Sequence, residues 1–113
     1  MSDPADFQVM TVGAGSGEVV VYLAGELDLA ARDRLAEALT VASATAHRLV
    51  IDLSRTTFID STGVKALVDV WRCRVDAQRD LVLREPAPVV MRTLEMAGVA
   101  DLLPIDRTDG PKR

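Results

Sequence analysis

A short apolar run at Leu49–Leu53 constrains the fold of this chain more than any other feature. Its residues are Leu, Val, Ile, Asp and Leu, a composition typical of a central strand that is covered on both faces. Apolar residues at helical spacing precede this run and follow it. A buried strand between two helices predicts a parallel sheet with right-handed crossover helices.

The rest of the chain continues this alternation of strands and helices. The patterns predict strands at about 7–12, 19–24, 49–53 and 81–83, with a fifth near 102–105, and helices near 30–44, 62–77 and 88–97. The turn at 13–17 joins the first two strands as a hairpin, with the first at an edge, and Gly25–Asp28 ends the second strand. Asp28 is placed to cap the first helix. We therefore expect an α/β fold with a mixed sheet of four to five strands.

The second predicted helix has a clear apolar face. Its buried stripe is expected to consist of Val64, Leu67, Val68, Trp71 and Val75. Cys73 lies beside this stripe, where a free cysteine most often acts as a small buried hydrophobic residue. As the only cysteine of the chain, it cannot form an internal disulfide, and this indicates a reducing, cytoplasmic location.

Length and composition indicate one soluble domain. The chain has 113 residues, with a core expected over 7–105 and flexible polar tails at 1–6 and 106–113. Its net charge of -4 argues against binding to nucleic acid. No apolar run approaches the ~20 residues that a membrane helix needs.

Motifs of catalysis and of cofactor binding are missing from the sequence. It contains no phosphate loop, no His-Glu-x-x-His and no Cys-x-x-Cys, and a single thiol argues against a structural zinc site. The only histidine, His47, is expected in a partly exposed loop at the start of the central strand, whereas Ser61 follows its end. The two cannot form a catalytic pair. We expect a protein that is not an enzyme and needs no cofactor or metal.

The segment that follows the central strand is the most informative one. Asp60–Gly63 begins a helix, and such residues cap helices by accepting hydrogen bonds from free backbone N–H groups, with Phe58–Ile59 as an apolar staple. One cap needs only one such residue, however, and Gly63 lowers helix propensity by about 1 kcal/mol relative to Ala. A glycine there also removes bulk beside Ser61. The pattern alone supports a helix cap and a functional site equally.

Several motifs, in this order, resemble those of the STAS domain family, in particular the bacterial anti-sigma factor antagonists. They are Gly25-Glu-Leu-Asp28, Asp52-Leu-Ser54, Phe58-Ile-Asp-Ser-Thr-Gly63 and Met96-Ala-Gly-Val99, within a resemblance that covers about residues 7–105. It implies a small STAS domain that, when unphosphorylated, binds an anti-sigma factor and releases the sigma factor. The anti-sigma factor is implied to be a serine kinase that uses ATP and Mg²⁺, and a phosphatase is implied to reset this partner switch in stress-response transcription.

The resemblance also assigns roles to residues. It makes Ser61 the phosphoacceptor, and the expected partner-binding residues are Asp28, Asp60, Ser61, Thr62, Gly63 and Lys65. Thr62 stands where many antagonists have a second serine. Lys65 adds a positive charge that either attracts the phosphoryl donor or an acidic partner, or is simply solvated.

Two questions stay open at this level. Family members commonly end in a further helix that covers the sheet, but the residues after Ile105 have no apolar stripe, which leaves the oligomeric state undecided. The alternative function is a constitutive STAS-type scaffold, or a nucleotide-binding module, in which Ser61 is only a helix cap.

Overall fold

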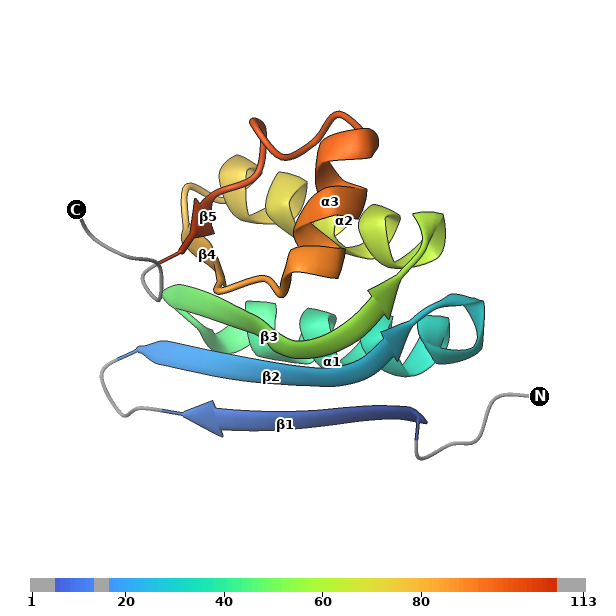
Figure 1. Ribbon diagram of the computed structural model, residues 1–113. Helices are drawn as coiled ribbons and strands as arrows, with labels where there is room; N and C mark the ends of the chain where they lie inside the picture. The colour runs from blue at the N-terminus through green and yellow to red at the C-terminus, as the bar shows by residue number, and fades with distance from the viewer. Residues whose placement is uncertain (1–5, 14–16, 108–113) are drawn as a thin grey trace.

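In residues 6–13 and 17–107, which the computed structural model describes, five strands form one mixed sheet in the order β1-β2-β3-β4-β5 (Figure 1). The elements in chain order are β1 (Phe7–Gly13), β2 (Glu18–Leu27), the 3-10 turn η2 (Leu29–Ala31), α1 (Arg32–Thr45), β3 (Arg48–Ile59), α2 (Ser61–Asp76), β4 (Asp80–Arg84), α3 (Pro88–Met96) and β5 (Ile105–Asp106). β1 pairs antiparallel with β2, and the remaining neighbours pair in parallel. The predicted α/β class, the edge position of the first strand and the central position of the third are confirmed.

The prediction that Gly25–Asp28 ends the second strand is wrong. Gly25 has a φ of 93°, a backbone conformation that residues other than glycine rarely adopt. The register with β3 shifts next to it, as expected for a bulge, and β2 continues to Leu27. The glycine bends the strand instead of ending it.

β3 is also longer than predicted, because the polar segment 54–57 belongs to the strand. Thr56 is buried within it, and its hydroxyl donates a hydrogen bond to the Leu23 carbonyl at 2.9 Å. β-Branched threonine suits an extended backbone, and this bond satisfies its polar atom inside the sheet. The strand therefore runs on to Ile59 and delivers the chain directly to α2.

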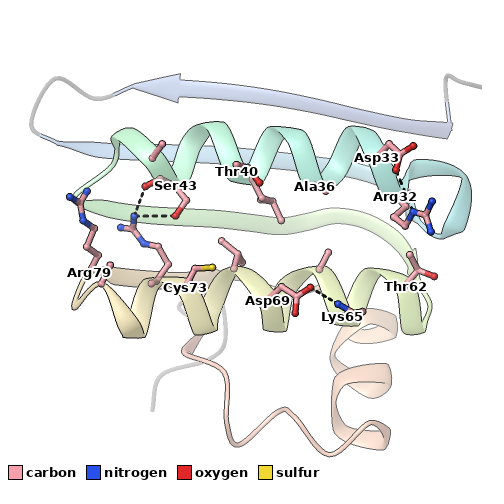
Figure 2. A pocket seen from close by; sticks show the side chains of 16 residues that line it. Arg32, Asp33, Ala36, Thr40, Ser43, Thr62, Lys65, Asp69, Cys73 and Arg79 are labelled. Carbon is pink, nitrogen blue, oxygen red and sulfur yellow. Dashed lines mark hydrogen bonds and ion pairs between the residues drawn. The ribbon is translucent and has the colours of Figure 1, made fainter.

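The α-helices of the described residues pack on one face of the sheet, with α2 between α1 and α3 (Figures 1 and 2). The core joins this face to all three helices, through residues such as Leu23, Ile51, Leu53, Leu35, Leu39, Leu67, Val90 and Leu94. Val50 and Asp52 of β3 point to the opposite face. Both are nevertheless buried, at 3% and 7% exposure, so the expectation of a central strand covered on both faces is confirmed, although the helices cover only one of these faces.

The buried face of α2 is rotated from the predicted stripe. Val64 and Leu67 are buried as expected, and Val68 and Trp71 are partly buried against the core. Val75, however, is exposed, whereas Val70 and Arg74 are buried. Cys73 is exposed as well, which contradicts the expected burial. The helix turns this face toward α1 as well as toward the sheet, because the Arg74 guanidinium reaches the last carbonyls of α1.

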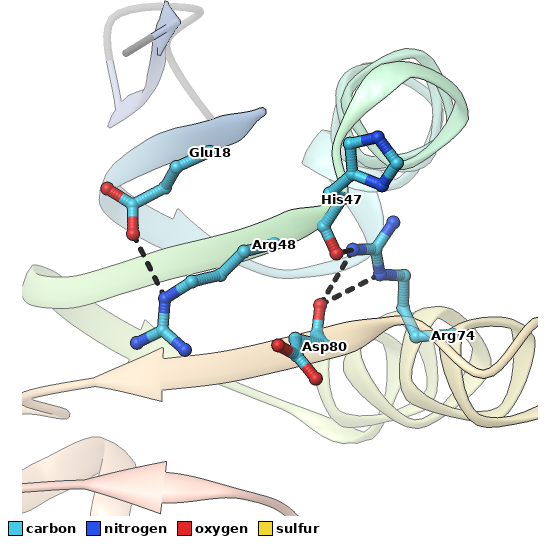
Figure 3. Close-up of polar contacts among 5 residues, drawn as sticks. All are labelled: Glu18, His47, Arg48, Arg74 and Asp80. Carbon is cyan, nitrogen blue, oxygen red and sulfur yellow. Dashed lines mark hydrogen bonds and ion pairs between the residues drawn. The ribbon is translucent and has the colours of Figure 1, made fainter. Parts of the chain in front are cut away.

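His47 lies exposed at the start of β3, as predicted, at the opposite end of that strand from Ser61. Its backbone carbonyl accepts a hydrogen bond from Arg74 at 2.8 Å (Figure 3). The fifth strand lies at Ile105–Asp106, later than the predicted 102–105, so the prediction that the flexible tail begins at 106 is wrong for Asp106, which pairs with Arg84 of β4. The rest of the predicted tails falls almost entirely outside the described residues, so its flexibility stays a prediction.

Candidate functional site

Two neighbouring parallel strands end side by side and bring Asp28 and Asp60 to one edge of the sheet. Leu27 of β2 is in register with Ile59 of β3, and the Asp60 N–H donates to the Leu27 carbonyl at 3.2 Å. Each aspartate then begins a helical segment, and an Asp28 carboxylate oxygen accepts from the Ala31 N–H at 3.3 Å. Both carboxylates therefore lie on the rim from which α2 begins.

Asp60, and not Ser61, is the residue that caps α2. Its Oδ1 accepts hydrogen bonds from the backbone N–H groups of Thr62, at 2.9 Å, and Gly63, at 3.2 Å. Ser61 is the first residue of the helix and is exposed. Within residues 6–13 and 17–107, nothing hydrogen-bonds its hydroxyl. Capping therefore leaves this hydroxyl unused and open to other molecules.

Gly63 has a different role from the one expected. It is buried, and a Cβ at this position would lie 2.5 Å from the Leu27 carbonyl oxygen and 2.7 Å from the Ile59 Cγ1. Its small size allows the first turn of α2 to contact the ends of β2 and β3 directly. The expectation that this glycine clears the surface beside Ser61 is wrong, and Gly63 presents no side chain to a partner.

Large apolar side chains are exposed around this rim. Leu29 is 63% exposed, Phe58 is 44% exposed and Met96 is 82% exposed. Phe58 does not form the expected staple with the helix, because only Ile59 of that pair is buried. The sequence predicted a staple at Phe58 and a family motif at Met96, and no pattern indicated that these three residues form an exposed surface. Exposed apolar groups gathered beside a polar group are typical of a protein-binding surface.

A groove runs between α1 and α2, and we call it the α1–α2 groove. Its volume is about 830 Å³, and Thr62 and Lys65 line the end nearest Ser61 (Figure 2). Arg79 lies at the far end, and the exposed Cys73 lies between the two ends. Small residues line much of it, so helices α1 and α2 leave space between their exposed edges.

A second groove lies between α2 and α3, and we call it the α2–α3 groove. It has a volume of about 550 Å³, and Ser61, Lys65, Asp69, Arg72 and Met96 are among its lining residues. Lys65 and Asp69 form an exposed ion pair, with 2.7 Å between Nζ and Oδ2, and they line both grooves. The candidate phosphoacceptor, Ser61, is thus the first residue of a helix whose Lys65–Asp69 ion pair separates the two grooves.

Asp52 and Ser54 lie apart from this rim, on the sheet face opposite the helices, whereas Leu53 between them is in the core. Asp52 Oδ1 accepts from the Ser54 hydroxyl at 2.6 Å, and Oδ2 pairs with Arg84 Nε at 2.9 Å. Burial opposes ionisation of Asp52, but the bonds from Ser54 and Arg84 outweigh it and lower the pKa of this carboxyl. Arg84 also contacts Tyr22 (Nη2 to OH, 3.4 Å). This cluster joins β2, β3 and β4.

The part of the chain that the structure describes was found to contain neither a cluster of metal ligands nor a helix suited to a membrane. No group of three or more His, Cys, Asp or Glu side chains there could hold a metal ion. No helix there is long and apolar enough to cross a membrane. The chemistry of the rim is that of a hydroxyl between carboxylates, apolar side chains and one lysine.

Comparison with known proteins finds a matching family. Residues 10–104 match the family described as "Mlab, STAS domain". An anti-sigma-B factor antagonist of Listeria monocytogenes is 29% identical over 91 residues, which span 80% of each chain.

Solved structures share the fold. An anti-sigma factor antagonist from Mycobacterium paratuberculosis superimposes with a TM-score of 0.82 at 25% identity, over 96% of this chain and 92% of that one. The Bacillus cell fate determinant SpoIIAA, in its phosphorylated form, gives a TM-score of 0.66 at 22% identity, over 91% and 93% of the two chains.

Proposed function

Since this chain belongs to the STAS domain family, we propose that it is an anti-sigma factor antagonist that phosphorylation of Ser61 switches off. The observation that carries the proposal is the Ser61 hydroxyl, which is exposed at the start of α2 and is released from capping by Asp60. Met96 lines the same groove as Ser61, and Leu29 and Phe58 are exposed close in sequence to Asp28 and Asp60, so a partner can dock on apolar surface near this hydroxyl. The names of the Listeria and Mycobacterium relatives support the same function.

In the proposed cycle, the unmodified protein binds an anti-sigma factor and thereby frees the sigma factor. The anti-sigma factor is a serine kinase that transfers a phosphoryl group from ATP to the Ser61 hydroxyl. A phosphatase removes the group and restores binding. The cycle takes place in the cytoplasm and needs no catalysis by this chain, whose part is to present Ser61, Thr62 and the apolar side chains to its partners.

The effect of the phosphate follows from the charges on the rim. The group adds a charge of about -1.5 to -2, and the N-terminus of α2 favours it by roughly 0.3–1 kcal/mol. Asp28 and Asp60 repel it, but water screens this repulsion while the site is exposed. A docked partner expels that water, so the repulsion and the cost of desolvation are felt in the complex. Phosphorylation should therefore change the stability of the fold little but weaken binding strongly. Each 1.4 kcal/mol of lost binding free energy lowers the affinity tenfold.

The test is to incubate the protein with the anti-sigma factor kinase of its own organism, ATP and Mg²⁺, and to locate phosphate by mass spectrometry. The wild-type protein should be labelled at Ser61, and Ser61→Ala should bind the kinase but stay unlabelled and active. Ser61→Asp should bind at least tenfold more weakly, because one carboxylate carries part of the phosphate charge.

Thr62→Ala is the matched control, since it removes the neighbouring hydroxyl and should be labelled like the wild type. Labelling of Ser61→Ala together with loss of labelling in Thr62→Ala would move the phosphoacceptor by one residue. If neither substitution changes labelling or binding, the protein is a constitutive scaffold, and Ser61 has no regulatory part.

A further inference from the structure

We propose that Lys65 is the counter-ion of the phosphoryl group on Ser61, and that phosphorylation draws Lys65 away from Asp69. The inference rests on the proposed function, because it concerns Ser61 in its modified state. In the unmodified protein the Lys65 ammonium is 2.7 Å from the Asp69 carboxylate. Their side chains are 75% and 51% exposed, so no packing holds the lysine in this position.

The positions along α2 place Lys65 midway between two anions. Ser61, Lys65 and Asp69 are spaced four residues apart and line the same α2–α3 groove, so they lie along one face of the helix. Residues four apart on a helix are within reach of each other. A phosphate on Ser61 and the carboxylate of Asp69 therefore compete for one ammonium group.

Two physical effects favour the phosphate in this competition. An ion pair four residues apart is stronger when the anion precedes the lysine, which holds for phosphorylated Ser61 with Lys65 and not for Lys65 with Asp69. The phosphate also carries a charge of about -1.5 to -2, against -1 for a carboxylate. Modification of Ser61 therefore moves the ammonium one turn toward the start of α2.

The exchange extends the effect of phosphorylation along the helix. Asp69 lies eight residues from Ser61, or about 12 Å along the axis. Because Asp69 lines both grooves, loss of its lysine changes the charge that each groove presents two turns from the modified residue. A partner that docks over α2 meets this rearrangement in addition to the phosphate itself.

The test uses protein in which phosphoserine is incorporated at position 61 during translation, so that no kinase is needed. ³¹P NMR then follows the second pKa of the phosphate, which is ordinarily about 6. A nearby ammonium group favours the dianion and lowers this pKa. We expect the pKa in Lys65→Gln to lie about 0.3 higher than in the unsubstituted phosphoprotein. Asp69→Asn should lower it, because the lysine loses its competing partner.

Controls separate a specific pair from a general change in charge. Arg72→Gln removes one positive charge from the same groove, but about 16 Å from Ser61 along the helix, beyond the Debye length, and should leave the pKa almost unchanged. In a Lys65→Gln background, Asp69→Asn should have no further effect, because Asp69 acts through the lysine. Asp28 and Asp60 are the same in every variant.

The ammonium signal of Lys65 gives a second readout, with Lys112, the other lysine of the chain, as internal reference. Asp69→Asn should shift the ¹⁵N signal of Lys65 in the unmodified protein and leave it unshifted in the phosphoprotein. Equal pKa values in Lys65→Gln and Arg72→Gln, or a Lys65 signal that still responds to Asp69 after modification, would overturn the proposal. Failure of a kinase to label Ser61 would refute the proposed function and leave these results unaffected.

Discussion

The guanidinium of Arg74 binds the backbone carbonyl of Asp80, through Nε at 3.1 Å and Nη2 at 2.7 Å, and does not pair with the Asp80 carboxylate (Figure 3). The same guanidinium donates to the carbonyls of Ser43, Ala46 and His47 at 2.8–3.0 Å. Arg74 is only 1% exposed. One buried charge thus joins the end of α1 and the starts of β3 and β4 to α2, and no carboxylate among the described residues pairs with it.

Replacement of Arg74 should destabilise the fold more than most substitutions. Burial lowers the pKa of Arg74, but an arginine stays charged, and its carbonyl partners compensate the lost hydration. Arg74→Met keeps much of the volume but removes a donor from four carbonyls, of which those of Ala46 and His47 keep another donor, so we expect a loss of about 3 kcal/mol or more. Arg74→Lys should lose less, since an ammonium reaches some of these oxygens. Urea unfolding measures the stability of both variants. Equal stability of Arg74→Met and the wild type would contradict the stabilising role of the Arg74 guanidinium.

Asp60 and Ser61 should differ in their contributions to stability. Asp60→Ala removes the cap of α2 and should lower the free energy of unfolding by about 1–2 kcal/mol. Ser61→Ala removes an unbonded hydroxyl and should change it by less than about 0.5 kcal/mol. Thermal unfolding of the two variants compares them directly. A larger loss in Ser61→Ala would mean that Ser61 is the cap.

Gly63→Ala tests the close approach of α2 to the sheet. The added methyl group would meet the Leu27 carbonyl oxygen at 2.5 Å, and backbone atoms cannot move aside easily. The gain of about 1 kcal/mol in helix propensity should be outweighed, for a net loss of about 1–2 kcal/mol. Gly13→Ala is the control, because nothing lies within 4 Å of its added Cβ. Gly63→Ala at wild-type stability would show that α2 can shift freely.

The Asp52–Arg84 pair should make stability depend on pH. Because the folded protein lowers the pKa of Asp52, this carboxylate contributes stability above its unfolded pKa of about 3.9, and the contribution is lost as the pH falls through the folded value. Arg84→Gln should raise the pKa of Asp52 and cost about 1 kcal/mol at neutral pH. The difference in stability between Arg84→Gln and the wild type should shrink as the pH falls from about 5 to about 2.

Arg48→Gln is the matched control for this pH dependence. It breaks the pair between Arg48 and Glu18, which is more exposed, and should cost less than about 0.5 kcal/mol at any of these pH values. A cost of Arg84→Gln that does not change with pH, measured by urea unfolding across this range, would show that the ion pair with Asp52 is not its cause.

Phe58→Ala should weaken binding to the anti-sigma factor without harm to the fold. An exposed aromatic at a docking surface commonly contributes more than 1 kcal/mol to binding, so we expect at least a fivefold loss of affinity by calorimetry. Val41 is likewise exposed, but lies on α1 away from the rim, and Val41→Ala should bind like wild type. Equal affinity of the two variants would place the interface elsewhere.

Local sequence patterns were enough to predict the order of strands and helices and the place where the candidate site begins. Alternating strand-like and helical spacing is a local property, which gave the α/β class, the central position of Leu49–Leu53 and a helix that starts after Asp60. The motifs were enough to identify the STAS family. Parallel pairing of adjacent strands then placed Asp28 and Asp60 on one rim.

The role of each site residue depends on contacts that exist only in the folded chain. Whether Asp60 or Ser61 caps α2 depends on the backbone conformation at one residue, and both residue types are good caps. The buried position of Gly63 and the exposure of Phe58 depend on how closely α2 approaches β2 and β3. Arg74 is buried and Val75 exposed because the free carbonyls that surround Arg74 come from residues 6 to 31 positions away along the chain. Local periodicity contains no information about such long-range partners, because they become neighbours only when the chain folds.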